Sequence, residues 1–203
     1  MGDATRAAVD TRARTIGFRS TADLEHLLAE HLAGADVLVM AAAVADYRPV
    51  PAARPDAVGG AGGGAGGGAG GGGGGGGKIR REKKNITLEL EPTPDLLAGC
   101  ASRRSPAQLL VGFALEPRDR LMESAREKLA RKGVDLIVAN PLETMDASSI
   151  EATLIGSPSI GASPDGIVAQ TEGPIEKSAF APWLLHQIDR ARAARRAGGH
   201  AVS

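Results

Sequence analysis

A basic cluster at Lys78–Lys84 is the first candidate for phosphate chemistry in this sequence. It directly follows a long run of glycine and alanine. Lysine and arginine side chains can stabilise the negative charge that develops when phosphorus is attacked. A lysine that follows a mobile loop, as Lys78 does, could close over a bound phosphate as part of a lid. The alternative is a solvated run of charge beside a linker.

The glycines before Lys78 imitate the end of a phosphate-binding P-loop. Residue 79 is isoleucine, however, so the hydroxyl that binds the metal ion in a P-loop is missing, and no strand precedes the glycines. We therefore reject a P-loop. A generic dinucleotide-binding domain is also disfavoured, because no G-x-G-x-x-G motif follows a predicted strand.

A second candidate lies at a predicted helix start. Thr93 is expected to cap the helix, Pro94 to occupy its first position and Asp95 to complement its dipole. The free backbone donors of such a helix start can hold an anion or the edge of a nucleotide. The alternative is an ordinary capped helix.

Three further charged residues have a functional and a plain interpretation. Lys128 and Lys132 lie one helical turn apart and form either a cationic site or a solvent-facing helix surface. Asp46 could hold a metal ion or a ribose, or could simply close a turn. The four histidines do not have metal-ligand spacing, so no metal site is predicted from protein ligands alone. Cys100 is the single cysteine, which excludes an internal disulfide and favours a small core residue.

Alternating helices and apolar strands are expected to position these residues. The valine-rich run at the start of 34–49 predicts a strand buried on both faces of a parallel sheet, with Asp46 just past its carboxyl end, where α/β sheets bind ligands. The fold class is therefore α/β, a Rossmann-like, mostly parallel sheet flanked by helices, with a C-terminal β-hairpin and helix. The other predicted strands are 15–19 (a short one), 86–91, 109–114 and 134–139, a hairpin pairs 152–156 with 166–171, and the helices are 20–31, one from 93 on, 118–132 (ended by Gly133) and 174–196.

The expected organisation is one domain with flexible ends. Residues 1–14 form a flexible arm, 15–196 a single α/β domain and 197–203 a flexible tail. Residues 59–77 contain only glycine and alanine, which bury no side chains, so a disordered loop is expected there.

Bulk composition narrows the possible partners. Lysine plus arginine equals aspartate plus glutamate, at 24 each, so no overall field favours nucleic acid or an anionic membrane. One tryptophan, one tyrosine and three phenylalanines are too few for an aromatic platform that stacks bases. No apolar run approaches the roughly 20 residues that span a bilayer. A cytoplasmic protein without nucleic-acid or membrane partners is expected.

The segment AAAVADYRP at 41–49 resembles the signature of phosphopantothenate–cysteine ligases, the ligase domain of the DNA/pantothenate metabolism flavoprotein family. Further segments resemble the family's motifs in the family's order, so the resemblance covers roughly residues 15–195. They are KIRR at 78–81 (the flap), TPDLL at 93–97, VGFA at 111–114, AREKLARK at 125–132 and DLIVAN at 135–140.

The resemblance implies a reaction in two steps. The carboxylate of 4'-phosphopantothenate attacks the α-phosphate of CTP, which gives an acyl-cytidylate and pyrophosphate, and the amine of L-cysteine then releases CMP. Mg²⁺ is expected with the CTP, no flavin is expected in this chain, and ATP replaces CTP in eukaryotic relatives. Lys78 is implied as the catalytic flap lysine; the implied nucleotide-binding residues are Asp46, Lys78, Pro94, Asp95, Leu96, Leu97, Phe113, Lys128 and Lys132.

The sequence also departs from the family pattern. It begins at what resembles the family's third strand, so it lacks the glycine-rich strand–loop–helix and the Asn-Arg-Ser-Ser-Gly-like segment that help bind phosphopantothenate. Arg80 and Arg81 replace flap lysines, which keeps the charge and changes its geometry, and Thr93 replaces an asparagine. A homodimer is expected, or a partner chain that carries the missing half. The alternative to a ligase is a non-catalytic or split-subunit nucleotide-binding remnant.

Overall fold

The structure is a computed structural model that describes residues 13–50, 89–157, 160 and 162–199. The chain divides into two compact units, with boundaries between Val44 and Ala45 and between Thr93 and Pro94. The larger unit holds the main sheet and the helices, and the smaller unit holds a two-stranded ribbon.

A five-stranded sheet forms the centre of the larger unit, in the order β1-β4-β5-β7-β8. The first three strands in this order run parallel, and β7 and β8 continue the sheet in antiparallel fashion, which confirms the mostly parallel α/β prediction and the C-terminal hairpin. The strands are β1 (Val37–Val39), β4 (Leu109–Glu116), β5 (Leu136–Pro141), β7 (Thr153–Gly156) and β8 (Ile167–Gln170). A separate pair, β6 (Ser149–Ile150) and β9 (Ile175–Glu176), precedes the last helix.

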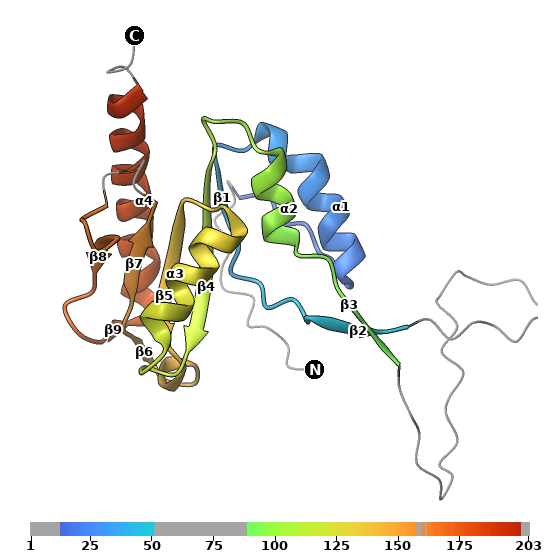
Figure 1. Cartoon of the computed structure of the whole chain (residues 1–203), viewed down its shortest axis with the longest axis horizontal. Coiled ribbons are helices and arrows are strands. Elements are labelled where there is room, and N and C mark those ends of the chain that lie inside the picture. The colour runs from blue at the N-terminus through green and yellow to red at the C-terminus, as the bar shows by residue number, and fades with distance from the viewer. Residues whose placement is uncertain (1–12, 51–88, 158–159, 161, 200–203) are drawn as a thin grey trace, which may run out of the picture. The chain divides into compact units, whose positions relative to one another are not determined.

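Helices cover both faces of this sheet (Figure 1). One face packs against α1 (Thr21–His31), the short helix η1 (Leu32–Gly34), α2 (Leu96–Arg103) and α3 (Leu121–Lys132). The other face packs against α4 (Lys177–Gly199). Strand residues alternate between the two: Leu110 and Ala114 of β4 join the first core cluster, and Leu109 and Val111 join the second. A further short helix, η2 (Leu142–Thr144), follows β5.

Local sequence signals fix the helix ends. Ser20 and Asp23 form a capping box at the start of α1, as the predicted start requires. Gly133 ends α3 with a φ of 62°, a left-handed conformation that glycine adopts at little cost. The predicted start of α2 was wrong by two residues. Asp95, not Thr93, is the N-cap and accepts from the Ala98 amide at 3.1 Å, whereas the Thr93 hydroxyl donates to the Ala45 carbonyl.

The strand predicted to be central lies instead at an edge. β1 spans only Val37–Val39 and pairs with β4 alone among the described residues. Val39 is 40% exposed, so the prediction of burial on both faces was wrong. The strand predicted at 15–19 is also absent, because no described strand pairs with that segment, and Phe18 is 49% exposed. The last helix begins at Lys177 rather than Pro174 because β9 precedes it.

A buried carboxylate joins the elements at the amino-terminal end of the sheet. Asp135, just before β5, is 1% exposed and accepts ion pairs from Arg104 and Arg195. It also accepts the Leu110 amide at 2.8 Å, and Arg195 donates to the Gln108 carbonyl at 2.7 Å. An unpaired charge at this depth would be costly, so the carboxylate needs these partners. Together they link the α2–β4 connection, β4, β5 and α4.

The smaller unit contains β2 (Tyr47–Pro49) and β3 (Leu90–Pro92), which pair antiparallel. Arg48 pairs with Glu91 across the ribbon at 2.6 Å. The Asp46 carbonyl accepts the Thr93 amide at 2.9 Å at the end of the ribbon. The predicted strand at 86–91 is described only from residue 89, and the glycine–alanine run lies outside the described residues. None of the described helices is both long and apolar enough to cross a bilayer.

Candidate functional site

Two lysines of α3 face α2 and β4, and we call this side of the helix the lysine flank (Lys128 and Lys132). Lys132 Nζ lies 2.9 Å from Asp95 Oδ1. The Lys132 side chain is 18% exposed, so this lysine is not on a solvent-facing helix surface. The Asp95 carboxylate therefore serves two elements, because the same oxygen caps α2 through the Ala98 amide.

Lys128 binds the backbone of the VGFA motif. Its Nζ donates to the Phe113 carbonyl at 3.3 Å. The Val111 carbonyl, on the same edge of β4, accepts the Met40 amide at 2.9 Å. Alternate carbonyls of a strand share an edge, and β1 has ended by that point, so among the described residues no strand partner faces the Phe113 carbonyl there. Lys128 supplies a donor where the neighbouring strand has stopped.

The glycine of the VGFA motif sets the approach of α2 to the sheet. A Cβ added at Gly112 would lie 2.8 Å from Leu97 Cδ2 and 2.9 Å from Ile137 Cδ1. Leu96 and Leu97 are both buried, so these two residues hold α2 against the core. Pro94 directly precedes the N-cap. The motif glycine thus lets the capped end of α2 pack close to β4.

Two competing effects set the charge of Asp95. Desolvation by burial is the largest and raises its pKa, while the hydrogen bonds from Lys132 and the Ala98 amide lower it. The hydrogen bonds and the nearby cations together outweigh desolvation, so the pKa of Asp95 lies below its ordinary value. Asp95 is therefore ionised at neutral pH, and its carboxylate forms an ion pair with Lys132.

The structure brings most of the predicted site residues together, although it does not test their roles. Pro94, Asp95, Leu96 and Leu97 lie at the α2 start, and Phe113, Lys128 and Lys132 lie across from it. Asp46 belongs to the smaller unit, and Lys78 lies outside the described residues. Sequence reasoning missed that Phe113 contributes its carbonyl and that Asp95 bonds Lys132. Since both depend on contacts between distant segments, no local pattern could have revealed them.

The described residues contain no group of three or more His, Cys, Asp or Glu side chains that could hold a metal ion. Asp95 is the carboxylate of the lysine flank, and it is already paired with Lys132. The donor set of this flank therefore suits anions rather than a metal ion.

The mostly parallel sheet flanked by helices places this chain among the Rossmann-like α/β proteins. A family model, the DNA/pantothenate metabolism flavoprotein C-terminal domain, matches residues 2–56 and 75–161. The chain belongs to this family, which confirms the resemblance found in its motifs.

Curated relatives agree with this assignment. The chain is 30% identical over 135 residues to the coenzyme A biosynthesis bifunctional protein CoaBC of Bacillus subtilis, covering 66% of this chain and 27% of the relative. It is 32% identical over 128 residues to a cysteine/cysteine sulfinic acid decarboxylase from an unknown prokaryotic organism, covering 63% and 29%. The chain thus spans less than a third of the length of these relatives.

A solved structure has the same fold. The crystal structure of the C-terminal domain of the coenzyme A biosynthesis bifunctional protein CoaBC superimposes with a TM-score of 0.54 at 26% identity. The match covers 85% of this chain and 63% of that chain. This neighbour confirms the α/β architecture.

Proposed function

We propose that this chain is a phosphopantothenate–cysteine ligase domain of coenzyme A biosynthesis that uses CTP. The observation that carries the proposal is the lysine flank, where two family-motif lysines meet the capped start of α2 and the VGFA strand. Membership of the family and the likeness to the CoaBC C-terminal domain support it.

In the first step, a carboxylate oxygen of 4'-phosphopantothenate forms a bond to the α-phosphorus of CTP, and the bond to pyrophosphate breaks. Lys128 and Lys132 are positioned to bind the nucleotide's phosphates as point charges, which stabilises the charge of the leaving group. For this, Lys132 must exchange the Asp95 carboxylate for a phosphate oxygen when CTP binds. Asp95 remains as the cap of α2.

In the second step, the amine of L-cysteine attacks the acyl carbon of the acyl-cytidylate. The C–N bond of the amide forms, the C–O bond to CMP breaks, and the amine loses a proton. The same lysines hold CMP while the acyl group transfers, because its phosphate keeps its negative charge. Lys78 is proposed as the flap lysine that closes on the reacting groups.

The magnesium ion expected with CTP has no set of protein ligands among the described residues. When bound to the triphosphate, such an ion neutralises charge on the phosphate oxygens. The steps above assign only the chain's own side chains, and Mg²⁺ enters as part of the nucleotide substrate.

Pyrophosphate release by the purified full chain tests the proposal. CTP and 4'-phosphopantothenate should release pyrophosphate, and CMP should appear only when L-cysteine is added. ATP in place of CTP tests the choice of nucleotide. If no pyrophosphate is released in any combination, by the chain alone or together with the protein encoded beside it, the ligase proposal is refuted.

The alternative is a non-catalytic or split-subunit domain that binds nucleotide and needs a partner chain. β1 pairs only with β4 among the described residues, and its Val39 is 40% exposed, whereas parallel strands are normally buried on both faces, which favours keeping this alternative. It predicts that the chain alone binds CTP, measured by calorimetry, without releasing pyrophosphate. Pyrophosphate release by the chain alone would exclude it.

A further inference from the structure

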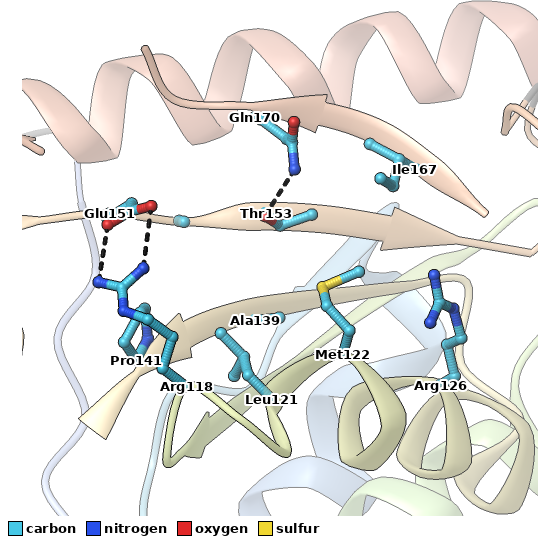
Figure 2. Close-up of a pocket in the computed structure, with 11 residues that line it drawn as sticks. Arg118, Leu121, Met122, Arg126, Ala139, Pro141, Glu151, Thr153, Ile167 and Gln170 are labelled. Carbon is cyan, nitrogen blue, oxygen red and sulfur yellow. Dashed lines mark hydrogen bonds and ion pairs between the residues drawn. The ribbon is translucent and has the colours of Figure 1, made fainter. Parts of the chain in front are cut away.

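A cleft lies on a different side of α3 from the lysine flank. It has a volume of about 360 Å³ and lies between α3 and the β7–β8 hairpin (Figure 2). We call this side of the helix the hairpin flank (Met122 and Arg126). Ligand clefts in proteins have volumes from roughly 300 Å³ upward, so a small molecule fits here.

The floor of the cleft is apolar, whereas Thr153 and Gln170 on the hairpin side are polar and bond to each other at 3.1 Å (Figure 2). Its floor includes Ala139 and Leu121, which are fully or almost fully buried. Figure 2 shows Met122 between the two ends of the cleft, with Ile167 on the opposite wall. These side chains are aliphatic or thioether groups, so they favour a flexible apolar body over a polar one.

The two ends of the cleft differ in charge. At one end, Arg118 and Glu151 form two hydrogen bonds, at 2.9 and 3.3 Å, so the charge of this arginine is already matched (Figure 2). The same pairing lowers the pKa of Glu151, which keeps the pair ionised. A ligand gains little from contacting a satisfied pair.

Arg126 occupies the other end. One amino group donates to the Asp165 carbonyl at 3.1 Å. Besides the Ser163 hydroxyl, the charge of Arg126 also helps to lower the pKa of the Asp165 carboxylate, although no carboxylate lies within ion-pair distance of this guanidinium among the residues that the structure describes. The nearby Asp165 carboxylate is held instead by the Ser163 hydroxyl. Arg126 therefore has donors available to the cleft, and a guanidinium fork suits a carboxylate.

We infer that the hairpin flank binds a small monocarboxylate with an aliphatic body, whose carboxylate meets Arg126 and whose chain covers the apolar floor. A single negative charge fits the one guanidinium at this end, which uses one donor on the Asp165 carbonyl and forms no ion pair among the described residues. Phosphate is disfavoured, because a second negative charge would be buried over apolar side chains without a second available cation.

Titration of the full chain with hexanoate, followed by protein NMR, tests this inference. Saturable shifts should appear at the amides of Ala139, Thr153 and Ile167. Each methylene removed should weaken binding about fourfold, so butanoate, which is two methylenes shorter, should bind roughly 16-fold more weakly than hexanoate. Hexylammonium and inorganic phosphate should give no saturable shift at these amides.

Two arginine variants make the test specific. Arg126→Gln should weaken hexanoate binding at least tenfold, whereas Arg131→Gln, an exposed arginine of the same helix, should leave it unchanged. The amide spectra of both variants establish that they fold. Absence of saturable hexanoate shifts, equal binding of hexylammonium or phosphate, or unchanged affinity in Arg126→Gln would each overturn the site. The titration requires no CTP, so its outcome is independent of the ligase proposal.

Discussion

The two flanks of α3 use cationic side chains in different ways. On the lysine flank, Lys132 bonds the Asp95 carboxylate and Lys128 bonds the Phe113 carbonyl. On the hairpin flank, Arg126 bonds one backbone carbonyl beside an apolar cleft. Residues four apart share a side of a helix, so Met122 and Arg126 lie on one side of α3 and Lys128 and Lys132 on another.

The difference teaches what each flank can bind. A lysine ammonium is a compact, strongly hydrated charge that can exchange one anionic partner for another. The lysine flank is therefore suited to a polyanion such as a triphosphate, which replaces resident acceptors. The hairpin flank combines a single guanidinium fork with apolar area, which suits a smaller and less charged molecule.

The largest expected effect separates the flanks by activity. Lys132→Gln removes a cation that we propose binds phosphate and should lower kcat/KM for CTP roughly 100-fold, the usual loss for one stabilising donor. Steady-state pyrophosphate release measures it. The matched control is Arg190→Gln, an exposed arginine on α4, on the opposite face of the sheet.

Equal rates in Lys132→Gln and Arg190→Gln would mean that the lysine flank does not bind the nucleotide's phosphates. The thermal melting temperature of each variant must accompany the rate, because Lys132 also anchors the start of α2. A loss of turnover with little change in melting assigns the effect to the site rather than to the fold.

The second expected effect concerns the packing that brings α2 to this flank. Gly112→Ala forces Leu97 and Ile137 to move and should lower the free energy of unfolding by about 1–3 kcal/mol. Gly99→Ala is the matched control within α2. A Cβ there meets no atom within 4 Å, so the alanine should stabilise the helix by about 0.5–1 kcal/mol.

Urea denaturation distinguishes these two glycines. If Gly112→Ala were neutral, the close approach of α2 to β4 would not be a structural requirement of the VGFA motif. If Gly99→Ala destabilised the protein as much, the effect would belong to α2 in general. The two variants thus sharpen the lysine flank's dependence on one short motif.

Much of the fold could be predicted because its signals are local. The predicted strand 109–114, LLVGFA, contains no polar side chain and therefore indicates a buried strand, as β4 proves to be. A glycine after a helical pattern, such as Gly133, indicates a helix end in the sequence, and the structure shows this residue in the left-handed conformation. The position of β1 at an edge could not be predicted, because apolar composition does not say how many neighbours a strand has.

The candidate site could be predicted only in part, for the same reason. The spacing of Lys128 and Lys132 reveals a shared side of one helix, but not that this side faces Asp95 and the end of β1. Arg118 and Arg126 escaped notice because the cleft between them is created by the hairpin, whose residues come much later in the chain. Contacts across long sequence separations have no local pattern.

The smallest expected effect separates the two roles of Asp95. Asn caps helices about as well as Asp, so Asp95→Asn should keep the cap and lose only the charge that attracts Lys132. Asp95→Ala loses both and should lower the free energy of unfolding by about 1 kcal/mol through the cap alone. Urea denaturation at pH 7 measures both variants against the wild type.

The pH dependence of the same variants tests the charge itself. Because the folded pKa of Asp95 is depressed, its charge contributes stability above the unfolded pKa, near 3.8, and that contribution is lost as the pH falls through the folded pKa. The stability difference between wild type and Asp95→Asn should therefore be full at pH 7 and shrink below about pH 3.8. Other carboxylates titrate in both proteins and cancel in the difference. A difference that stays constant down to pH 2 would show that Asp95 holds Lys132 through a hydrogen bond rather than through its charge. Lys132 would then resemble Arg126 of the hairpin flank, which bonds a neutral carbonyl.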